Sequence, residues 1–156
     1  MNAFVTVFYD WSRIVAGWFA WVAPLAARIV VGWVFLWSGW TKLQMLPRMV
    51  ENFREWGIPA PEFFTPLASG IEFVCGLLLL FGLLTRFAAV PMMIVMAVAI
   101  IAAKSADIDS LETFLGFDEV AYFVIFAWLA VAGPGPLSAD RFVLKAAGRN
   151  PDEYGA

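Results

Sequence analysis

The chain has 156 residues, of which 62% are hydrophobic and 15% are charged, and its mean hydropathy is +0.80. Soluble globular domains contain about 45–50% apolar and about 25% charged residues, and a domain of this length leaves much of its surface exposed. Because water cannot cover so much apolar surface, we expect one domain that is embedded in a lipid bilayer.

Several kinds of functional site are excluded by the residues that the chain lacks. It has no histidine, which excludes histidine-ligated haem, zinc-histidine sites and Ser-His-Asp triads. Its single cysteine, Cys75, leaves no intrachain disulfide and no thiolate metal cage, so we expect no metal site. A net charge of −3 disfavours nucleic acid as a partner, since phosphate binding needs a basic surface.

Four apolar segments are expected to cross the membrane as helices, because a helix needs about 20 residues to span the hydrocarbon core. The connection Thr85-Arg86 is tight, so the second and third segments should form an antiparallel hairpin. The fourth segment ends at the Gly-Pro-Gly-Pro sequence and is expected to begin earlier than Glu119, within residues 111–117. The predicted fold is an all-α, integral membrane four-helix bundle with spans over residues 24–43, 66–84, 87–103 and 119–133.

Two further segments are amphipathic. Apolar side chains in residues 1–22 recur at alternating intervals of four and three, which draws one stripe along a helix. Asp10 and Arg13 interrupt the apolar run that a signal peptide would need. We therefore expect a helix in the headgroup region, with a fifth span as the alternative. Residues 46–56 repeat the pattern on the opposite side, as a surface helix or a shallow re-entrant cap over the bundle.

The lysine and arginine residues near the span ends predict the orientation. With four spans, the side of the N-terminus holds six of these residues and the other side holds four. Both termini are therefore expected in the cytoplasm of a bacterial or archaeal cell, with the protein in its inner membrane. The six are Arg13, Arg28, Arg86, Arg141, Lys145 and Arg149, and the four are Lys42, Arg48, Arg54 and Lys104.

Glu72 is the clearest charged residue at membrane depth, about two turns into the second span. Inserting such a charge costs roughly 2.5–3.5 kcal/mol at the bilayer centre, so its presence indicates a functional or structural role. Counted from Lys42, Glu72 should lie level with residues 37–38, and the other spans should bring Lys104, Glu119 and Tyr122 towards the same end. One interpretation is a polar pocket at the non-cytoplasmic end, where Glu72 gives or takes a proton or binds a ligand.

A structural interpretation stays open beside it, in which Glu72 forms an ion pair with Lys42 or Lys104 that locks the helices together. Arg28 has a simpler explanation, because its long stem can snorkel from the first turn of its span to the headgroups. Cys75 is expected to be a small buried hydrophobic residue.

Trp33, Trp37 and Trp40 recur at i, i+4 and i+7 along the first span. A flat hydrophobic ligand such as a quinone ring could stack there, with packing against neighbouring helices or lipid as the alternative. Glycines in the first and second spans, among them Gly39 and Gly76, suit close packing of the two helices.

Several motifs resemble the DoxX family of membrane proteins. The sequence FLWSGWTKL at residues 35–43 is similar to the FLxxGxxKL signature that ends the first span of that family. The resemblance continues through Gly57-Ile58-Pro59 and through IEFVCGLLLLFGLLTR at residues 71–86. It ends at GPGPLSADR, residues 133–141, which is similar to the closing GxGxxSxD of the family.

The resemblance implies a four-helix membrane protein in which Lys42 and Glu72 stand where family members typically carry these residue types. Members are associated with membrane redox systems, including the small subunit of thiosulfate:quinone oxidoreductase and complexes that link oxidative-stress and sulfur-transfer enzymes. We divide the chain into an amphipathic helix at residues 1–22, a DoxX-like membrane domain at 23–141 and a cytoplasmic tail at 142–156.

The resulting hypothesis is a membrane subunit of a quinone-linked redox assembly that anchors a soluble protein partner. Glu72 would donate or accept protons and Lys42 would orient it or contact a carbonyl. The quinone pocket would be completed by Trp37, Trp40, Tyr122 and Lys104. Because the chain has no visible electron carrier, electrons would come from the partner or a bound cofactor. The alternatives are a non-catalytic membrane scaffold and a carrier of a small hydrophobic or acidic solute, which would need alternating access.

Overall fold

The computed structural model describes residues 2–154, and within these residues every regular element is a helix. The predicted all-α class is confirmed. The elements are α1 (Asn2–Phe19), α2 (Val22–Gln44), α3 (Leu46–Glu55), α4 (Pro61–Phe81), α5 (Thr85–Ala99), η1 (Ile100–Lys104), η2 (Ser105–Asp107), α6 (Leu111–Leu115), α7 (Asp118–Ala132), α8 (Ala139–Ala146) and η3 (Pro151–Tyr154).

Three helical segments of the described chain are long and apolar enough to cross a membrane: Val22–Gln44, Pro61–Phe81 and Thr85–Asp107. They correspond to the first three expected spans, but the turn of the hairpin lies at residues 82–84, and Thr85-Arg86, the expected connection, already belongs to α5. The fourth expected span is α7, and its 15 residues rise only about 22 Å at 1.5 Å per residue, against a core of about 30 Å. Residues 111–117 do not extend α7, because α6 ends at Leu115 and Phe117 has an extended backbone. The length of α7 therefore does not establish a fourth span.

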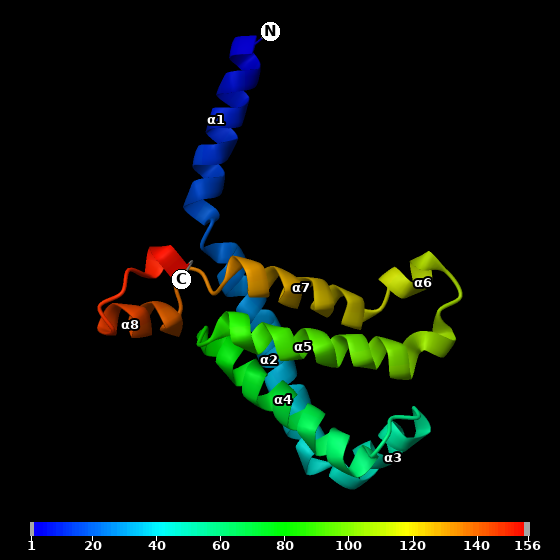
Figure 1. Cartoon of the computed structure of the whole chain (residues 1–156). Helices are drawn as coiled ribbons and strands as arrows, with labels where there is room; N and C mark the ends of the chain where they lie inside the picture. The colour runs from blue at the N-terminus through cyan, green and yellow to red at the C-terminus, as the bar shows by residue number, and fades with distance from the viewer. Residues whose placement is uncertain (1, 155–156) are drawn as a thin grey trace.

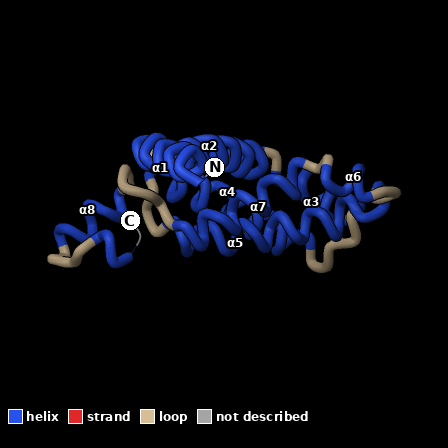
Figure 2. The backbone as a smooth tube through the Cα atoms, turned by 90° about the horizontal axis from the view of Figure 1, so that it is seen from above, coloured by secondary structure: helices blue, strands red, loops and turns tan. Residues whose placement is uncertain are grey.

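The long helices pack as two pairs, α2 with α4 and α5 with α7 (Figure 1). The tight turn between α4 and α5 joins the pairs, and from this turn end the pairs diverge towards α3 and α6. Figure 2 shows α2 and α5 on opposite faces of the bundle. The apolar core lies between the pairs and includes Val31, Phe35, Leu79, Met92, Phe126 and Leu129.

The pair α2–α4 is held together by contact between the two backbones. A Cβ atom built on Gly39 would lie 2.4 Å from the backbone nitrogen of Phe73, and one on Gly76 would lie 2.4 Å from that of Leu36. Any side chain at these positions would have to push the helices apart. The expected close packing at the two glycines is confirmed, and it gives the tightest interface of the fold.

Arg28 lies at the turn end and is buried, with a relative exposure of 1%, so the snorkelling interpretation was wrong. Its Nη2 donates a hydrogen bond to the carbonyl oxygen of Leu137 at 2.6 Å. A Cβ on Gly82, which has a φ of 68°, would lie 1.7 Å from Nη1 of Arg28. The loop before α8 folds over the guanidinium and takes it away from the headgroups.

Asp140 fastens the same end by capping α5. Its carboxylate accepts hydrogen bonds from the backbone N–H groups of Leu84 and Thr85, at 2.7 and 3.2 Å, and its own N–H donates to the carbonyl of Gly82. The first N–H groups of a helix have no partner within it, so this carboxylate satisfies two of them and also meets the positive end of the helix dipole.

The two amphipathic segments are both helical. α1 extends away from the other helices (Figure 1), and two residues of its apolar stripe, Trp11 and Trp18, are 63% and 71% exposed. That α1 lies on the membrane surface stays a prediction. α3 is the expected short helix between the first two spans, and Arg54 ties it to α4 through Glu62 at 2.7 Å.

We predict that Gly76→Ala weakens the α2–α4 contact, because the added methyl group meets the backbone of α2. The expected loss is about 1–3 kcal/mol of unfolding free energy, measured by unfolding in detergent micelles. Gly70→Ala is the matched control on α4, since nothing lies within 4 Å of its added Cβ. It should leave stability unchanged or raise it slightly, and equal losses in both variants would contradict the backbone contact.

Asp140→Ala should also destabilise the fold, by about 1–2 kcal/mol, because the start of α5 loses its cap. Asp152→Ala is the control: that carboxylate pairs with Arg141 but is 72% exposed, so its loss should cost less than about 0.5 kcal/mol. Thermal unfolding of both variants in the same detergent compares the two losses.

Candidate functional site

Glu72 on α4 faces two polar side chains of α2 at membrane depth. The ammonium of Lys42 donates to both of its carboxylate oxygens, at 2.6 Å to Oε1 and 2.7 Å to Oε2. The hydroxyl of Ser38 donates to Oε2 at 2.9 Å. Ser38 and Lys42 are four residues apart and so share one face of α2. The close approach of the backbones at Gly39 brings this face to Glu72.

The two partners of the ion pair differ in exposure. The Glu72 side chain is 4% exposed and the Lys42 side chain 34%. A lysine ammonium has three N–H donors, and the single carboxylate of Glu72 cannot engage all of them. Lys42 therefore keeps one donor for another acceptor, whereas Glu72 already accepts three hydrogen bonds and has little accessible surface. In this arrangement Lys42 is the member of the pair that a ligand can reach.

The ion pair lies in the wall of a cavity of about 730 Å³ between the two helix pairs. Most of the lining is apolar, and the polar side chains gather towards the end that carries α3 and α6. The α2–α4 side contributes Ser38, Lys42 and Glu72, and the α5–α7 side contributes Lys104, Asp118, Glu119 and Tyr122. A large, mostly apolar space with a few convergent polar groups is the usual form of a small-molecule site.

Two of the expected site residues are held by aromatic contacts. The ring of Tyr122 packs edge-on against Phe35, with ring centroids 5.1 Å apart. Lys104 Nζ lies 5.5 Å from the centroid of the Phe117 ring. Lys104 ends the π-helical turn η1, which no sequence signal predicted. Such turns are rare and frequently occur at functional sites.

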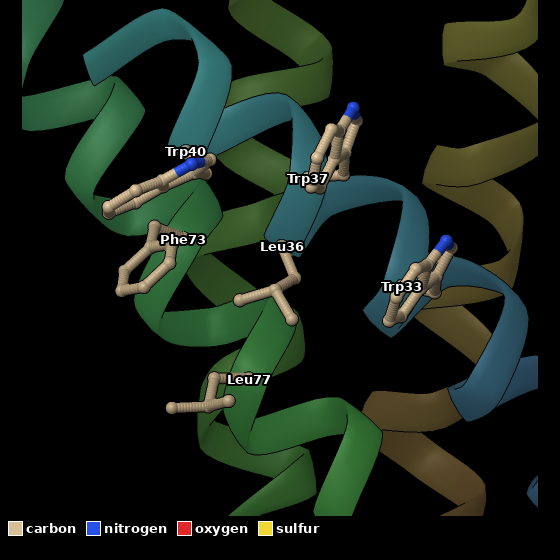
Figure 3. Close-up of a pocket in the computed structure, with 6 residues that line it drawn as sticks. All are labelled: Trp33, Leu36, Trp37, Trp40, Phe73 and Leu77. Atoms are coloured by element: carbon tan, nitrogen blue, oxygen red, sulfur yellow. The ribbon is translucent and has the colours of Figure 1, made fainter. Parts of the chain in front are cut away.

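Trp37 and Trp40 are not in this cavity. With Trp33, Phe73 and Leu77 they line a separate groove of about 370 Å³ on the outer face of the α2–α4 pair (Figure 3). The reason is helical geometry: a helix turns about 100° per residue, so Trp37 and Trp40 point away from the face of Ser38 and Lys42. The structure therefore separates the tryptophans from Glu72, and a count around the helix would have found this.

The sequence did not mark Ser38 as a site residue, because its hydrogen bond to Glu72 depends on a tertiary contact. Cys75 is buried in the apolar core, as expected. Within residues 2–154, no group of three or more Cys, Asp or Glu side chains is placed to hold a metal ion.

The sequence pattern of the DoxX family matches residues 23–105 of this chain, which include α2, α4, α5 and both members of the ion pair. The chain belongs to the DoxX family. It is a membrane protein with three apolar helices long enough to span a bilayer.

Three relatives cover most of the chain. The "Uncharacterized membrane protein Rv3486" of Mycobacterium tuberculosis is 37% identical over 79% of this chain and 82% of its own length. The "Putative oxidoreductase CatD" of Bacillus subtilis is 29% identical over 80% of this chain and 89% of its own length. The "Inner membrane protein YqjF" of Escherichia coli is 29% identical over 80% and 94%. No solved structure matches the chain.

The unequal burial of the ion pair predicts unequal effects of breaking it. Lys42→Met leaves a carboxylate buried without a cation and should cost about 3 kcal/mol of unfolding free energy. Glu72→Gln leaves an ammonium on a side chain that is 34% exposed, and should cost less, about 1 kcal/mol. Unfolding in mixed micelles measures both variants, and a larger loss in Glu72→Gln would contradict this account.

Proposed function

We propose that this protein is an integral membrane subunit of a quinone-linked redox assembly, which anchors a soluble protein partner and binds quinone in the cavity beside Lys42 and Glu72. The observation that carries the proposal is the buried ion pair in the wall of a mostly apolar cavity of about 730 Å³ at membrane depth. The printed name of the Bacillus subtilis relative, an oxidoreductase, agrees with redox chemistry.

The cavity fits a quinone in volume and chemistry. Apolar side chains from α2, α4 and α5 surround the space that the ring would take, and the remaining N–H donor of Lys42 can bind a carbonyl oxygen. When bound, a quinone supplies the capacity to take up two electrons and two protons. In this proposal the electrons come from the partner or a bound cofactor.

Three side chains have distinct roles in the proposed quinone site. Lys42 Nζ orients the ring by donating to its carbonyl and is the nearest proton donor to that oxygen. Glu72 fixes the direction of the Lys42 ammonium through both carboxylate oxygens, and its negative charge would favour the uptake of a proton from water by Lys42 after one is delivered to the ring. Ser38 holds Glu72 from its other side. Tyr122 and Lys104 line the opposite wall.

The proposed topology has four membrane-crossing helices with both termini in the cytoplasm. α7 is short, but it packs along α5, and thinning of the local bilayer can accommodate a short helix. The six-to-four distribution of Lys and Arg supports the orientation. The cavity then lies towards the non-cytoplasmic end, and the partner approaches one of the two aqueous faces.

A non-catalytic membrane scaffold is the second candidate, and one observation favours it. Glu72 is 4% exposed and accepts hydrogen bonds from both Lys42 and Ser38, so the pair is complete without any ligand. In that case the ion pair fixes α2 against α4 and the protein only positions its partner.

Lipid extraction and native mass spectrometry of the protein purified in mild detergent would test the proposal. We expect quinone to co-purify with the wild-type chain, and Glu72→Gln to lose it while still inserting into the membrane. Glu62→Gln is the matched control on α4, because Glu62 is 66% exposed and pairs with Arg54 outside the cavity. It should retain quinone.

The two candidates give different results in this experiment. A wild-type chain that carries a stoichiometric protein partner but no quinone would support the scaffold and overturn the quinone proposal. Equal quinone retention in Glu72→Gln and wild type would also overturn the role given to the ion pair.

A further inference from the structure

Several apolar side chains that line the cavity keep a large accessible surface, so the cavity is open to the outside where they stand. Leu67 on α4 is 43% exposed, and Ile94 and Val98 on α5 are 60% and 45% exposed. A residue that borders both an internal space and the outside marks an opening between them. These three residues stand on the two helices that diverge from the turn end (Figure 1).

This opening lies at the depth of the ion pair. Leu83 lies in the turn between α4 and α5, and Glu72 and Ile94 are equally far from it along the chain, on α4 and α5. Because both helices rise by the same distance per residue, Glu72 and Ile94 lie at a similar distance from the turn. Both helices belong to the candidate spans Pro61–Phe81 and Thr85–Asp107. What surrounds the opening is therefore the hydrocarbon of the bilayer rather than water or headgroups.

The cavity also has an end beneath α3, lined by Phe53, Trp56 and Ile58. Trp56 is 41% exposed, so this end also borders the outside. The charged side chains Lys104, Asp118 and Glu119 line the cavity too, outside the core of the bundle. The cavity thus offers charged and polar groups at one end and a purely apolar opening between α4 and α5.

We propose that the gap between α4 and α5, bordered by Leu67, Ile94 and Val98, is a lateral portal through which a tailed, membrane-dissolved ligand enters the cavity from the lipid. The inference rests on the proposed quinone site and specifies its ligand class: an amphiphile with a hydrogen-bond acceptor on its ring and a long apolar tail. The ring reaches Lys42, and the tail stays in the portal between apolar side chains of α4 and α5.

Solvation of the tail favours entry from the lipid. An isoprenoid or alkyl tail loses favourable burial if it must pass through water, at about 0.8 kcal/mol for each CH₂ group. A path from the bilayer keeps the tail in an apolar medium throughout. A ligand without a tail does not need this path, because it can also enter at the α3 end.

Ile94→Trp tests the portal by filling it with a larger side chain. Ile101→Trp is the matched control: Ile101 is 70% exposed on the same span but does not line the cavity. Each variant, reconstituted in lipid nanodiscs, is heated with and without decyl-ubiquinone, and in parallel with the tailless dimethoxy-methyl-benzoquinone ring. The measurement is the rise in the unfolding midpoint that a ligand gives when it binds the native state.

In wild type and Ile101→Trp we expect both quinones to raise the midpoint. In Ile94→Trp the rise with decyl-ubiquinone should be lost, while the rise with the tailless ring should remain. A full rise with decyl-ubiquinone in Ile94→Trp would overturn the portal and leave the quinone site standing. No rise with either quinone in wild type would overturn the proposed function, and the portal with it.

Discussion

The fold depends on the contact between the backbones of α2 and α4, which is possible only because glycine stands at the points of closest approach. Gly39 and Gly76 have no side chain to hold the helices apart. The same approach brings Ser38 and Lys42 within hydrogen-bond distance of Glu72. A charged group can remain in a membrane helix when its partner is this close, because the partner supplies the hydrogen bonds and the opposite charge that lipid hydrocarbon cannot supply.

The two ends of the bundle are built in opposite ways. At the turn end, Arg28 and Asp140 tie the loop before α8 to the helices, and the pairs are held together by hydrogen bonds to backbone groups. At the other end, the pairs diverge and the space between them is the cavity. The helix pairs are thus fixed together at the turn end and separated at the other end, so the cavity is present without the movement of a loop.

The proposed function follows from how polarity is distributed around that cavity. Lys42 is the more accessible member of the ion pair, and Glu72 compensates its charge. A bound molecule would therefore contact an N–H donor of Lys42 whose charge is already balanced. Apolar side chains surround the rest of the space, and the proposed portal between α4 and α5 would open to lipid. These features favour a ligand that dissolves in the membrane. The separate tryptophan groove offers no polar side chain beside it except the indole N–H groups.

The sequence by itself determined the membrane class, the first three spans, the hairpin and the level of Glu72 with residues 37–38, because these follow from hydropathy, length and rise per residue. It did not determine which partner Glu72 takes, since Lys42 and Lys104 were both within reach. Tertiary structure decided that choice and the burial of Arg28. It also decided the length of α7 and the π-helical turn before Ser105. The physical reason is that hydropathy fixes depth along the bilayer normal, whereas rotation about each helix axis and the distance between helices are set by packing.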